Sequence, residues 1–239
     1  TLTADQQNAI DRIQSATDFS VFLLYGITGS GKTEVYLAAM EKILQAGKQV
    51  LMLVPEIGLT PQTIQRFKER LPYPMVSYHS KMSDRERLDA WLHAKSGTAK
   101  ILIGTRSAIF TPMPSLGIII IDEEHDGSFK QQDGFRYSAR DLAVLRANRL
   151  QIPLLLGTAT PSLETLSNAQ QGRYQHLRLT NRAGNAKPPE IQLLDIRGKT
   201  LTEGFAAETI TAIEKEITAG NQELVFLNRR GYAPTLDCQ

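Results

Sequence analysis

Short apolar runs recur along the chain up to residue 156, and they are continuous rather than alternating. They occupy residues 21–25, 50–54, 101–103, 118–121 and 154–156. Continuous apolar runs are typical of strands that are covered on both faces, as in parallel sheets. The pattern therefore predicts a mainly parallel sheet whose strands are buried.

The segments between these runs have the spacing of helices. Residues 33–46 place Tyr36, Met40 and Leu44 on one stripe, and Gly47 follows as a helix stop. Further helices are predicted at about 60–71, 83–95 and 138–149. Because strands and helices alternate, we expect a three-layer α/β domain with right-handed crossovers.

The pattern changes after about residue 180. Residues 181–189 are polar and end in the pair Pro188-Pro189, which is typical of a linker. A short strand at 191–194, a helix at 206–218 and a strand at 223–227 are predicted beyond it.

This organisation predicts one lobe in residues 1–180, a linker in 181–190, and the first β-α-β piece of a second lobe in 191–239. So short a final segment cannot enclose a core of its own. We therefore expect the chain to be a truncated piece of a longer protein.

Composition narrows the class of protein without indicating a function. The 239 residues carry 27 Lys and Arg against 25 Asp and Glu, and a net charge of +2 is too small to indicate a nucleic-acid binder by itself. The single cysteine, Cys238, excludes an internal disulfide, and no Cys/His pair has the spacing of metal ligands. Neither a signal peptide nor a membrane-spanning run is visible, so we expect a soluble, cytoplasmic protein with no membrane partner.

Candidate chemistry begins directly after the first apolar run. Residues 26–33 read Gly-Ile-Thr-Gly-Ser-Gly-Lys-Thr and fit the phosphate-loop pattern G-x-x-x-x-G-K-[ST] without a mismatch. In such a loop the backbone N–H groups surround phosphate oxygens, the lysine reaches the β- and γ-phosphates, and the final hydroxyl binds Mg²⁺. A chance glycine-rich turn is the weaker alternative, because a strand precedes the loop and a helix follows it. The predicted nucleotide-binding residues are Gly26, Thr28, Gly29, Ser30, Gly31, Lys32 and Thr33.

Two carboxylates follow another buried run. Asp122 and Glu123 come directly after residues 118–121. In a parallel sheet the carboxyl ends of the strands lie at one edge, so both should lie near the phosphate loop. Asp122 is then placed to bind Mg²⁺, and Glu123 to polarise the attacking water. The alternative is a solvated acidic turn after a strand.

Further residues form a pattern that resembles superfamily 2 helicases. Residues 122–125 (Asp-Glu-Glu-His) resemble the D-E-x-H form of motif II, and residues 157–160 (Gly-Thr-Ala-Thr) resemble motif III. Residues 104–106 are similar to motif Ib, and residues 54–60 are similar to motif Ia. Residues 2–6 lie where this superfamily reads adenine, which makes Gln6 a candidate contact of the base.

A closer resemblance is to the PriA family of bacterial primosomal replication-restart helicases. Residues 122–126, 129–137 and 226–234 carry it, and it covers essentially the whole chain. It implies a RecA-like ATP-binding lobe of an ATP-dependent 3′ to 5′ DNA helicase, with ATP and Mg²⁺ as cofactors. It implies single-stranded and forked DNA, single-stranded DNA-binding protein and other primosome proteins as partners. The family's zinc-binding cysteine pairs have no counterpart in this sequence, so we expect no zinc on this chain.

The resemblance also assigns roles outside the phosphate loop. His125, Thr158 and Thr160 are expected to transmit the nucleotide state to the DNA site. The segment 127–137 interleaves aromatic rings with cations, which suits single-stranded nucleic acid because bases stack on rings and cations contact phosphates. Its candidate residues are Phe129, Lys130, Phe135, Arg136 and Tyr137. Contacts with the DNA backbone are expected from Thr60, Thr105 and Arg106.

Each of these assignments has a structural alternative. The aromatic rings of residues 127–137 could anchor that segment to the core, and Arg106 could form a surface ion pair. The isolated histidines His79, His93 and His176 are expected to be structural.

Other functions stay open from the sequence. A RecG-like fork remodeller or another superfamily 2 translocase shares the general motifs, and only residues 130–137 and 228–234 argue against it. A P-loop kinase or transporter ATPase would need an arginine-bearing lid or a signature loop, and neither is visible. In isolation the chain could also be a non-catalytic nucleotide- or DNA-binding module. The resemblance assigns the transition-state arginines to a late motif that this sequence does not contain, so we expect the chain alone to bind nucleotide and hydrolyse it slowly.

Overall fold

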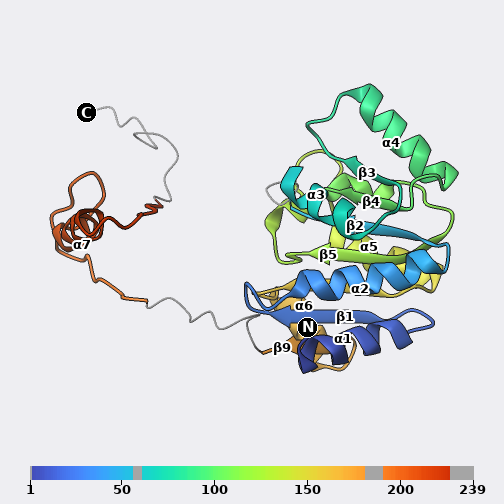
Figure 1. Cartoon of the computed structure of the whole chain (residues 1–239), viewed down its shortest axis with the longest axis horizontal. Helices are drawn as coiled ribbons and strands as arrows, with labels where there is room; N and C mark the ends of the chain where they lie inside the picture. Colours follow the sequence, from blue (N-terminus) through green and yellow to red (C-terminus); the bar gives the residue numbers. More distant parts are fainter. Residues whose placement is uncertain (1, 56–60, 181–190, 227–239) are drawn as a thin grey trace. The chain divides into compact units, whose positions relative to one another are not determined.

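The computed structural model describes residues 2–55, 61–180 and 191–226 (Figure 1). The chain divides into two units, Thr1–Ala186 and Lys187–Gln239. Every strand in the described part of the chain lies in the first unit. None of the helices in the same described ranges is long and apolar enough to cross a membrane.

The first unit is built on a seven-stranded sheet in which all neighbouring strands run parallel. The strand order is β3-β4-β2-β5-β8-β1-β9. The strands are β1 (Val21–Gly26), β2 (Gln49–Leu53), β3 (Met75–Tyr78), β4 (Ile101–Gly104), β5 (Leu116–Asp122), β8 (Leu154–Thr158) and β9 (Gln175–Leu179). The predicted parallel α/β lobe is therefore confirmed.

The apolar runs predicted as strands form the inner strands β1, β2, β4, β5 and β8. Within β5, Ile118 and Ile120 belong to the core on one face of the sheet, while Ile119 and Ile121 belong to the core on the other. Because successive side chains of a strand point to opposite faces, a strand covered on both faces has to be apolar throughout. The edge strands β3 and β9 were not predicted, because their side chains are partly exposed and include the exposed Arg178.

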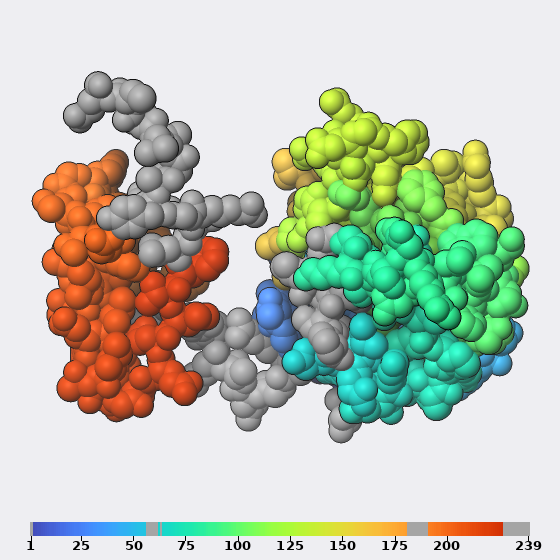
Figure 2. Space-filling view, turned by 90° about the horizontal axis from the view of Figure 1, so that it is seen from above, coloured from blue at the N-terminus to red at the C-terminus, as the bar shows by residue number. Residues whose placement is uncertain are grey.

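Helices cover both faces of this sheet. Ile10 of α1, Tyr36 of α2 and Phe67 of α3 pack into one core, and Ala94 of α4 and Ala143 of α5 pack into the other. Figure 2 shows the part of the chain that contains α3 and α4, in teal and green, at the surface of the first unit. The bounds are α1 (Ala4–Ser15), α2 (Lys32–Gln45), α3 (Pro61–Arg70), α4 (Asp84–Ser96), α5 (Ala139–Leu150) and α6 (Leu163–Gln170), with the 3₁₀ helices η2 (Arg106–Phe110) and η3 (Gly127–Phe129).

Side-chain caps explain where several helices begin. Ser83 accepts a hydrogen bond from the Glu86 backbone at the start of α4, and Ser138 caps α5 in the same way. Thr3 and Gln6 form a capping box at the start of α1. Helix α1 was not predicted, although the Thr-x-x-Gln spacing of that box was present in the sequence.

The second unit differs from the prediction. Its helix α7 (Ala207–Thr218) forms as expected, but neither 191–194 nor 223–226 is a strand, and residue 227 lies outside the described residues. Within this unit's described residues the only β pairing is the isolated bridge between Thr202 and Phe205. A strand requires hydrogen bonds to a neighbouring strand, and no described segment here supplies one. The expected β-α-β piece is thus reduced to a helix with flanking segments.

Candidate nucleotide site and coupling network

The phosphate loop connects the end of β1 to the start of α2. The N-cap residue of α2 is Gly31, whose φ of 82° lies in the left-handed region that favours glycine. A Cβ atom at Gly31 would lie 2.2 Å from Nε2, the far end of the Gln6 side chain, so a larger residue would have to displace that side chain. The left-handed turn requires the glycine of the motif.

Gln6 holds this loop from α1. Its side chain is buried, its Nε2 donates to the carbonyl oxygen of Ser30 at 2.9 Å, and its Oε1 accepts from the Thr3 backbone at 2.9 Å. The predicted base-contacting residue is thus also a support of the phosphate loop.

The predicted catalytic residues lie around one pocket of ≈ 390 Å³. Nζ of Lys32 donates to the Gly26 carbonyl at 2.9 Å and lies 4.0 Å from Oε1 of Glu123. Glu34 and Arg66, which were not predicted to lie here, also line this pocket. The predicted residues in its wall are Thr28, Gly29, Ser30, Gly31, Lys32, Thr33, Asp122 and Glu123.

The side chains of this pocket fit a nucleotide phosphate and a divalent cation. In the described part of the chain, Oγ of Ser30 is buried and has no hydrogen-bond partner. Thr33 and Asp122 bring a hydroxyl and a carboxylate to the wall of the pocket, and oxygen atoms of this kind are the ligands that Mg²⁺ prefers. Among the described residues no cluster of three or more His, Cys, Asp or Glu could hold a metal ion.

Asp122 lies at the end of β5 in a largely buried position. Burial raises the pKa of its carboxyl, and the hydrogen bond from the Tyr36 hydroxyl opposes this shift. Burial also raises the pKa of Tyr36 well above its ordinary value, as does the adjacent Asp122 carboxylate, so Tyr36 stays a hydrogen-bond donor. Glu123 has a φ of 48°, which is strained for a residue other than glycine. Such strain is common where a side chain is held for function.

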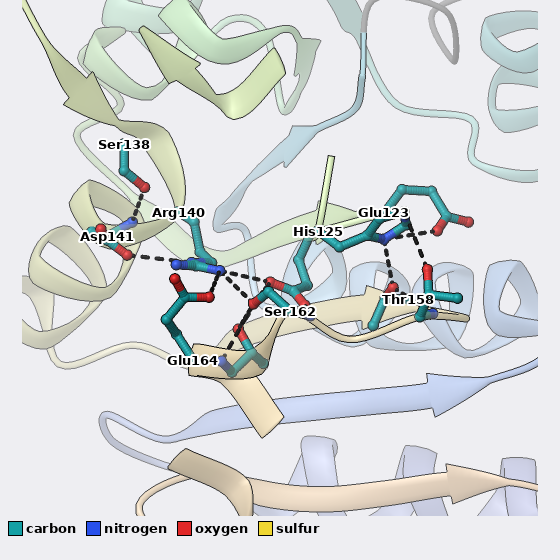
Figure 3. Close-up of polar contacts among 11 residues, drawn as sticks. Glu123, His125, Ser138, Arg140, Asp141, Thr158, Ser162 and Glu164 are labelled. Carbon is teal, nitrogen blue, oxygen red and sulfur yellow. Dashed lines mark hydrogen bonds and ion pairs between the residues drawn. The ribbon is translucent and has the colours of Figure 1, made fainter. Parts of the chain in front are cut away.

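His125 connects the two predicted coupling segments (Figure 3). Its Nδ1 lies 2.8 Å from Oγ1 of Thr158, and its Nε2 lies 3.2 Å from Oγ1 of Thr160. Nδ1 also lies 3.6 Å from Oε2 of Glu123. The structure therefore brings together the residues that the sequence placed in motifs II and III.

A buried carboxylate, Glu124, joins this region to two helices. Its side chain is fully buried and accepts from the Ser162 backbone N–H at 2.8 Å, from Thr165 Oγ1 at 2.9 Å and from Arg140 at 3.2 Å. Burial of Arg140 opposes its charge, but the hydrogen bond to Glu124 and the charge of Asp141 raise the pKa of its guanidinium. Figure 3 shows Arg140 between Asp141 and Glu164, beside Ser162.

The aromatic-rich segment 127–137 divides into an anchor and an exposed part. The Phe129 side chain is buried in the core, so it anchors the segment and its ring is not free to stack on a base. The residues Lys130–Gln131 (β6) and Tyr137–Ser138 (β7) pair as an antiparallel hairpin. Phe135 is 78% exposed, and Lys130 and Arg136 are also exposed.

An aromatic group extends from this hairpin to η2. The centroid of the Tyr137 ring lies 5.0 Å from the centroid of the Phe110 ring, with the two rings edge to face, and 6.0 Å from the centroid of the Phe135 ring. Phe110 is 53% exposed. The three rings therefore form one partly exposed aromatic surface.

Arg106 makes hydrogen bonds to η3 and to the hairpin, and within the described ranges it forms no ion pair. Its guanidinium donates to the carbonyls of Ser128 and Lys130 at 3.1 and 3.0 Å, and it lies 6.0 Å from the Tyr137 ring centroid. Thr105 is buried at the start of η2. Thr60, the remaining predicted backbone contact, lies outside the described residues.

Comparison with known families decides the class of this chain. A sequence model described as DEAD/DEAH box helicase matches residues 3–169, which is more than half of the chain. The chain belongs to the DEAD/DEAH box helicase family. The matched region of this helicase chain includes the phosphate loop, Asp122, His125 and Thr158.

Curated relatives of this helicase chain include replication restart proteins. The replication restart protein PriA of Haemophilus influenzae is 50% identical over 238 residues, which are 100% of this chain and 33% of the relative. PriA of Bacillus subtilis is 42% identical over 245 residues, covering 100% of this chain and 30% of the relative. The resemblance to PriA is confirmed, and the chain spans about a third of the length of these curated relatives.

Solved structures of other proteins share the fold of this helicase chain. RecG bound to a three-way DNA junction aligns with a TM-score of 0.61 and 21% identity, covering 92% of this chain and 28% of that one. The Hef helicase domain of Pyrococcus furiosus aligns with a TM-score of 0.53 and 22% identity, covering 74% of this chain and 38% of that one. At these identities the likeness concerns the fold alone.

The helicase motifs left out three residues that lie at the site. Glu124 occupies the variable position of D-E-x-H, so the motif carries no information about it. Tyr36 was placed on the apolar stripe of the helix at 33–46, and periodicity cannot show whether the hydroxyl of a buried ring contacts a site. Phe110 belongs to none of the motifs.

Proposed function

We propose that this chain is the ATP-binding lobe of an ATP-dependent DNA helicase of the replication-restart type. The observation that carries the proposal is that Lys32, Thr33, Asp122 and Glu123 line the same pocket. These residues come from the phosphate loop and from the end of β5, and their side chains match the parts required for phosphoryl transfer.

Each side chain of the pocket has a distinct part in this proposal. Lys32, now bonded to the Gly26 carbonyl, would contact the β- and γ-phosphates. Thr33 and Asp122 would hold Mg²⁺, which neutralises phosphate charge when bound. Glu123, held near Lys32 and His125, would orient the attacking water and accept its proton.

Coupling to DNA is proposed to pass through His125 and the hairpin. His125 contacts Thr158 at the end of β8 and Thr160 just after it, so a movement of motif II would be transmitted to motif III. The exposed rings of Phe110 and Phe135 would stack on bases of single-stranded DNA, and Lys130 and Arg136 would contact its phosphates.

The likeness to PriA along the whole chain supports the wider setting of the proposal. We propose that the full protein moves 3′ to 5′ on single-stranded DNA, acts at forks, and works with single-stranded DNA-binding protein and other primosome proteins. The isolated chain is expected to hydrolyse ATP slowly, because the resemblance assigns the transition-state arginines to another lobe.

Nucleotide binding tests the proposed function directly. The chain is expected to bind a fluorescent ATP analogue in the presence of Mg²⁺, and unlabelled ATP should displace it. Removing the cation with EDTA should weaken binding, because the phosphates would lose the charge that Thr33 and Asp122 hold next to them. Titration followed by fluorescence anisotropy measures this, and a chain that shows no saturable binding with Mg²⁺ contradicts the proposal.

Replacing Phe135 by alanine is expected to weaken binding of a labelled oligo-dT. The loss should be about 1–3 kcal/mol if the ring stacks on one base. The matched control is Leu88→Ala, which removes another exposed apolar side chain, on α4. Fluorescence anisotropy at fixed salt measures both variants, and equal affinities for the Phe135 variant and wild type would exclude the stacking role.

A further inference from the structure

Tyr36 reaches from α2 to the end of β5. Its ring is 1% exposed, and it packs in the core between the helix and the sheet. Its hydroxyl donates to Oδ1 of Asp122 at 2.8 Å. A hydrophobic contact alone would need only a phenyl ring, so the hydroxyl has to be explained by its partner.

The neighbouring strand leaves room for this hydroxyl. Gly157 of β8 pairs in register with Asp122 of β5. A Cβ atom at Gly157 would lie 1.7 Å from the Tyr36 hydroxyl oxygen and 2.7 Å from Cζ of that ring. Gly157, the first residue of motif III, therefore leaves the space that the Tyr36 hydroxyl occupies, and any side chain at this position would clash with it.

The hydrogen bonds fix the rotation of the Asp122 carboxylate. Oδ1 accepts from the Tyr36 hydroxyl and, at 3.1 Å, from the Glu123 backbone N–H. Within the described residues no hydrogen bond involves Oδ2. With Oδ1 held by two donors, Oδ2 is the oxygen left for a ligand in the pocket that Asp122 shares with Thr33.

We propose that Tyr36 is a positioning residue, whose hydroxyl holds Asp122 so that Oδ2 is presented to the divalent cation of a bound nucleoside triphosphate. The inference rests on the proposed function of the pocket. It adds a residue of α2 to the metal site by way of its carboxylate ligand. Carboxylates that bind metals are commonly oriented by such hydrogen bonds, and their loss weakens the site.

The test is the Mg²⁺ dependence of nucleotide binding by the whole chain. Tyr36→Phe removes the hydroxyl and keeps the ring, and we expect it to need about 10-fold more Mg²⁺ for half-maximal binding of the fluorescent ATP analogue. Binding without Mg²⁺ should equal that of wild type. Tyr73→Phe is the control, because Tyr73 packs against the same core cluster. An unchanged Mg²⁺ requirement in Tyr36→Phe overturns the inference.

A double-mutant cycle separates positioning from a change in folding. In an Asp122→Asn background, Tyr36→Phe should have no further effect on the Mg²⁺ requirement, because the residue acts through the Asp122 charge. A second, additive loss would show that Tyr36 acts on the fold instead, and would overturn the inference. If the wild-type chain does not bind the fluorescent ATP analogue in the presence of Mg²⁺, the proposed function is wrong, and the inference about Tyr36 is wrong with it.

Discussion

Lys32→Ala is expected to weaken binding of the Mg²⁺-bound ATP analogue by roughly 10- to 150-fold, since hydrogen bonds to charged groups contribute about 1.5–3 kcal/mol. The Lys32 side chain is only 10% exposed and lies between the Gly26 carbonyl and Glu123. Its ammonium group is therefore held inside the phosphate pocket before any ligand arrives. Alanine removes that charge while α2 keeps a good helix-forming residue at its first position.

The control for this variant is Lys42→Ala, at the other end of the same helix. Lys42 lies in the last turn of α2, where it donates to the carbonyl of Gln14, and it does not line the pocket. Fluorescence anisotropy measures binding, and circular dichroism during heating shows whether each variant is folded. A folded Lys32 variant with wild-type affinity would refute the assignment of the phosphate loop.

Glu124→Ala is expected to lower the free energy of unfolding by about 3–5 kcal/mol, because removing one partner of a buried ion pair leaves the other without compensation. The Glu124 side chain is fully buried and serves as acceptor for Arg140, Thr165 and the N-terminus of α6 at Ser162. Glu124→Gln, which keeps one acceptor oxygen, should lose less. Urea unfolding followed by circular dichroism measures both.

Glu164→Ala provides the matched control for the buried carboxylate. Glu164 lies 3.9 Å from the same Arg140 nitrogen, but its side chain is 62% exposed. Exposed ion pairs contribute little because water and salt screen them, so its unfolding midpoint should stay close to that of wild type. If both variants unfold at the wild-type midpoint, Glu124 is not a structural centre of this region.

Local sequence patterns were sufficient to predict the inner strands of the sheet but not its two edge strands. The inner strands have two covered faces, so their apolar runs are continuous and easily recognised. β3 and β9 have one neighbour each and mixed polarity, and their pairing depends on β4 and β1, which are distant in the sequence. The strands predicted at 191–194 and 223–227 are not seen in the described residues of the second unit, because a strand forms only when a neighbouring strand offers hydrogen bonds.

The motif residues of the site were predictable because they lie in short, contiguous segments of the sequence, residues 26–33 and 122–125. A glycine-rich loop before a helix, and carboxylates after a buried strand, lie near each other in any parallel sheet of this kind. The sequence could not show that Arg106 donates hydrogen bonds to the carbonyls of Ser128 in η3 and Lys130 in β6, or that Phe129 is buried. Both facts depend on how the hairpin folds back onto η2 and the core.

The amino-acid order alone thus specified the parallel lobe, the phosphate loop, the two carboxylates and the helicase class, since each depends on neighbours along the chain. Only the tertiary structure showed the hydrogen bond from Tyr36 to Asp122, which are 86 residues apart, and the hydrogen bond from Arg140 to Glu124, which are 16 residues apart. A buried side chain finds its hydrogen-bond partner through packing in three dimensions, and the spacing of residues along the chain carries no record of that partner.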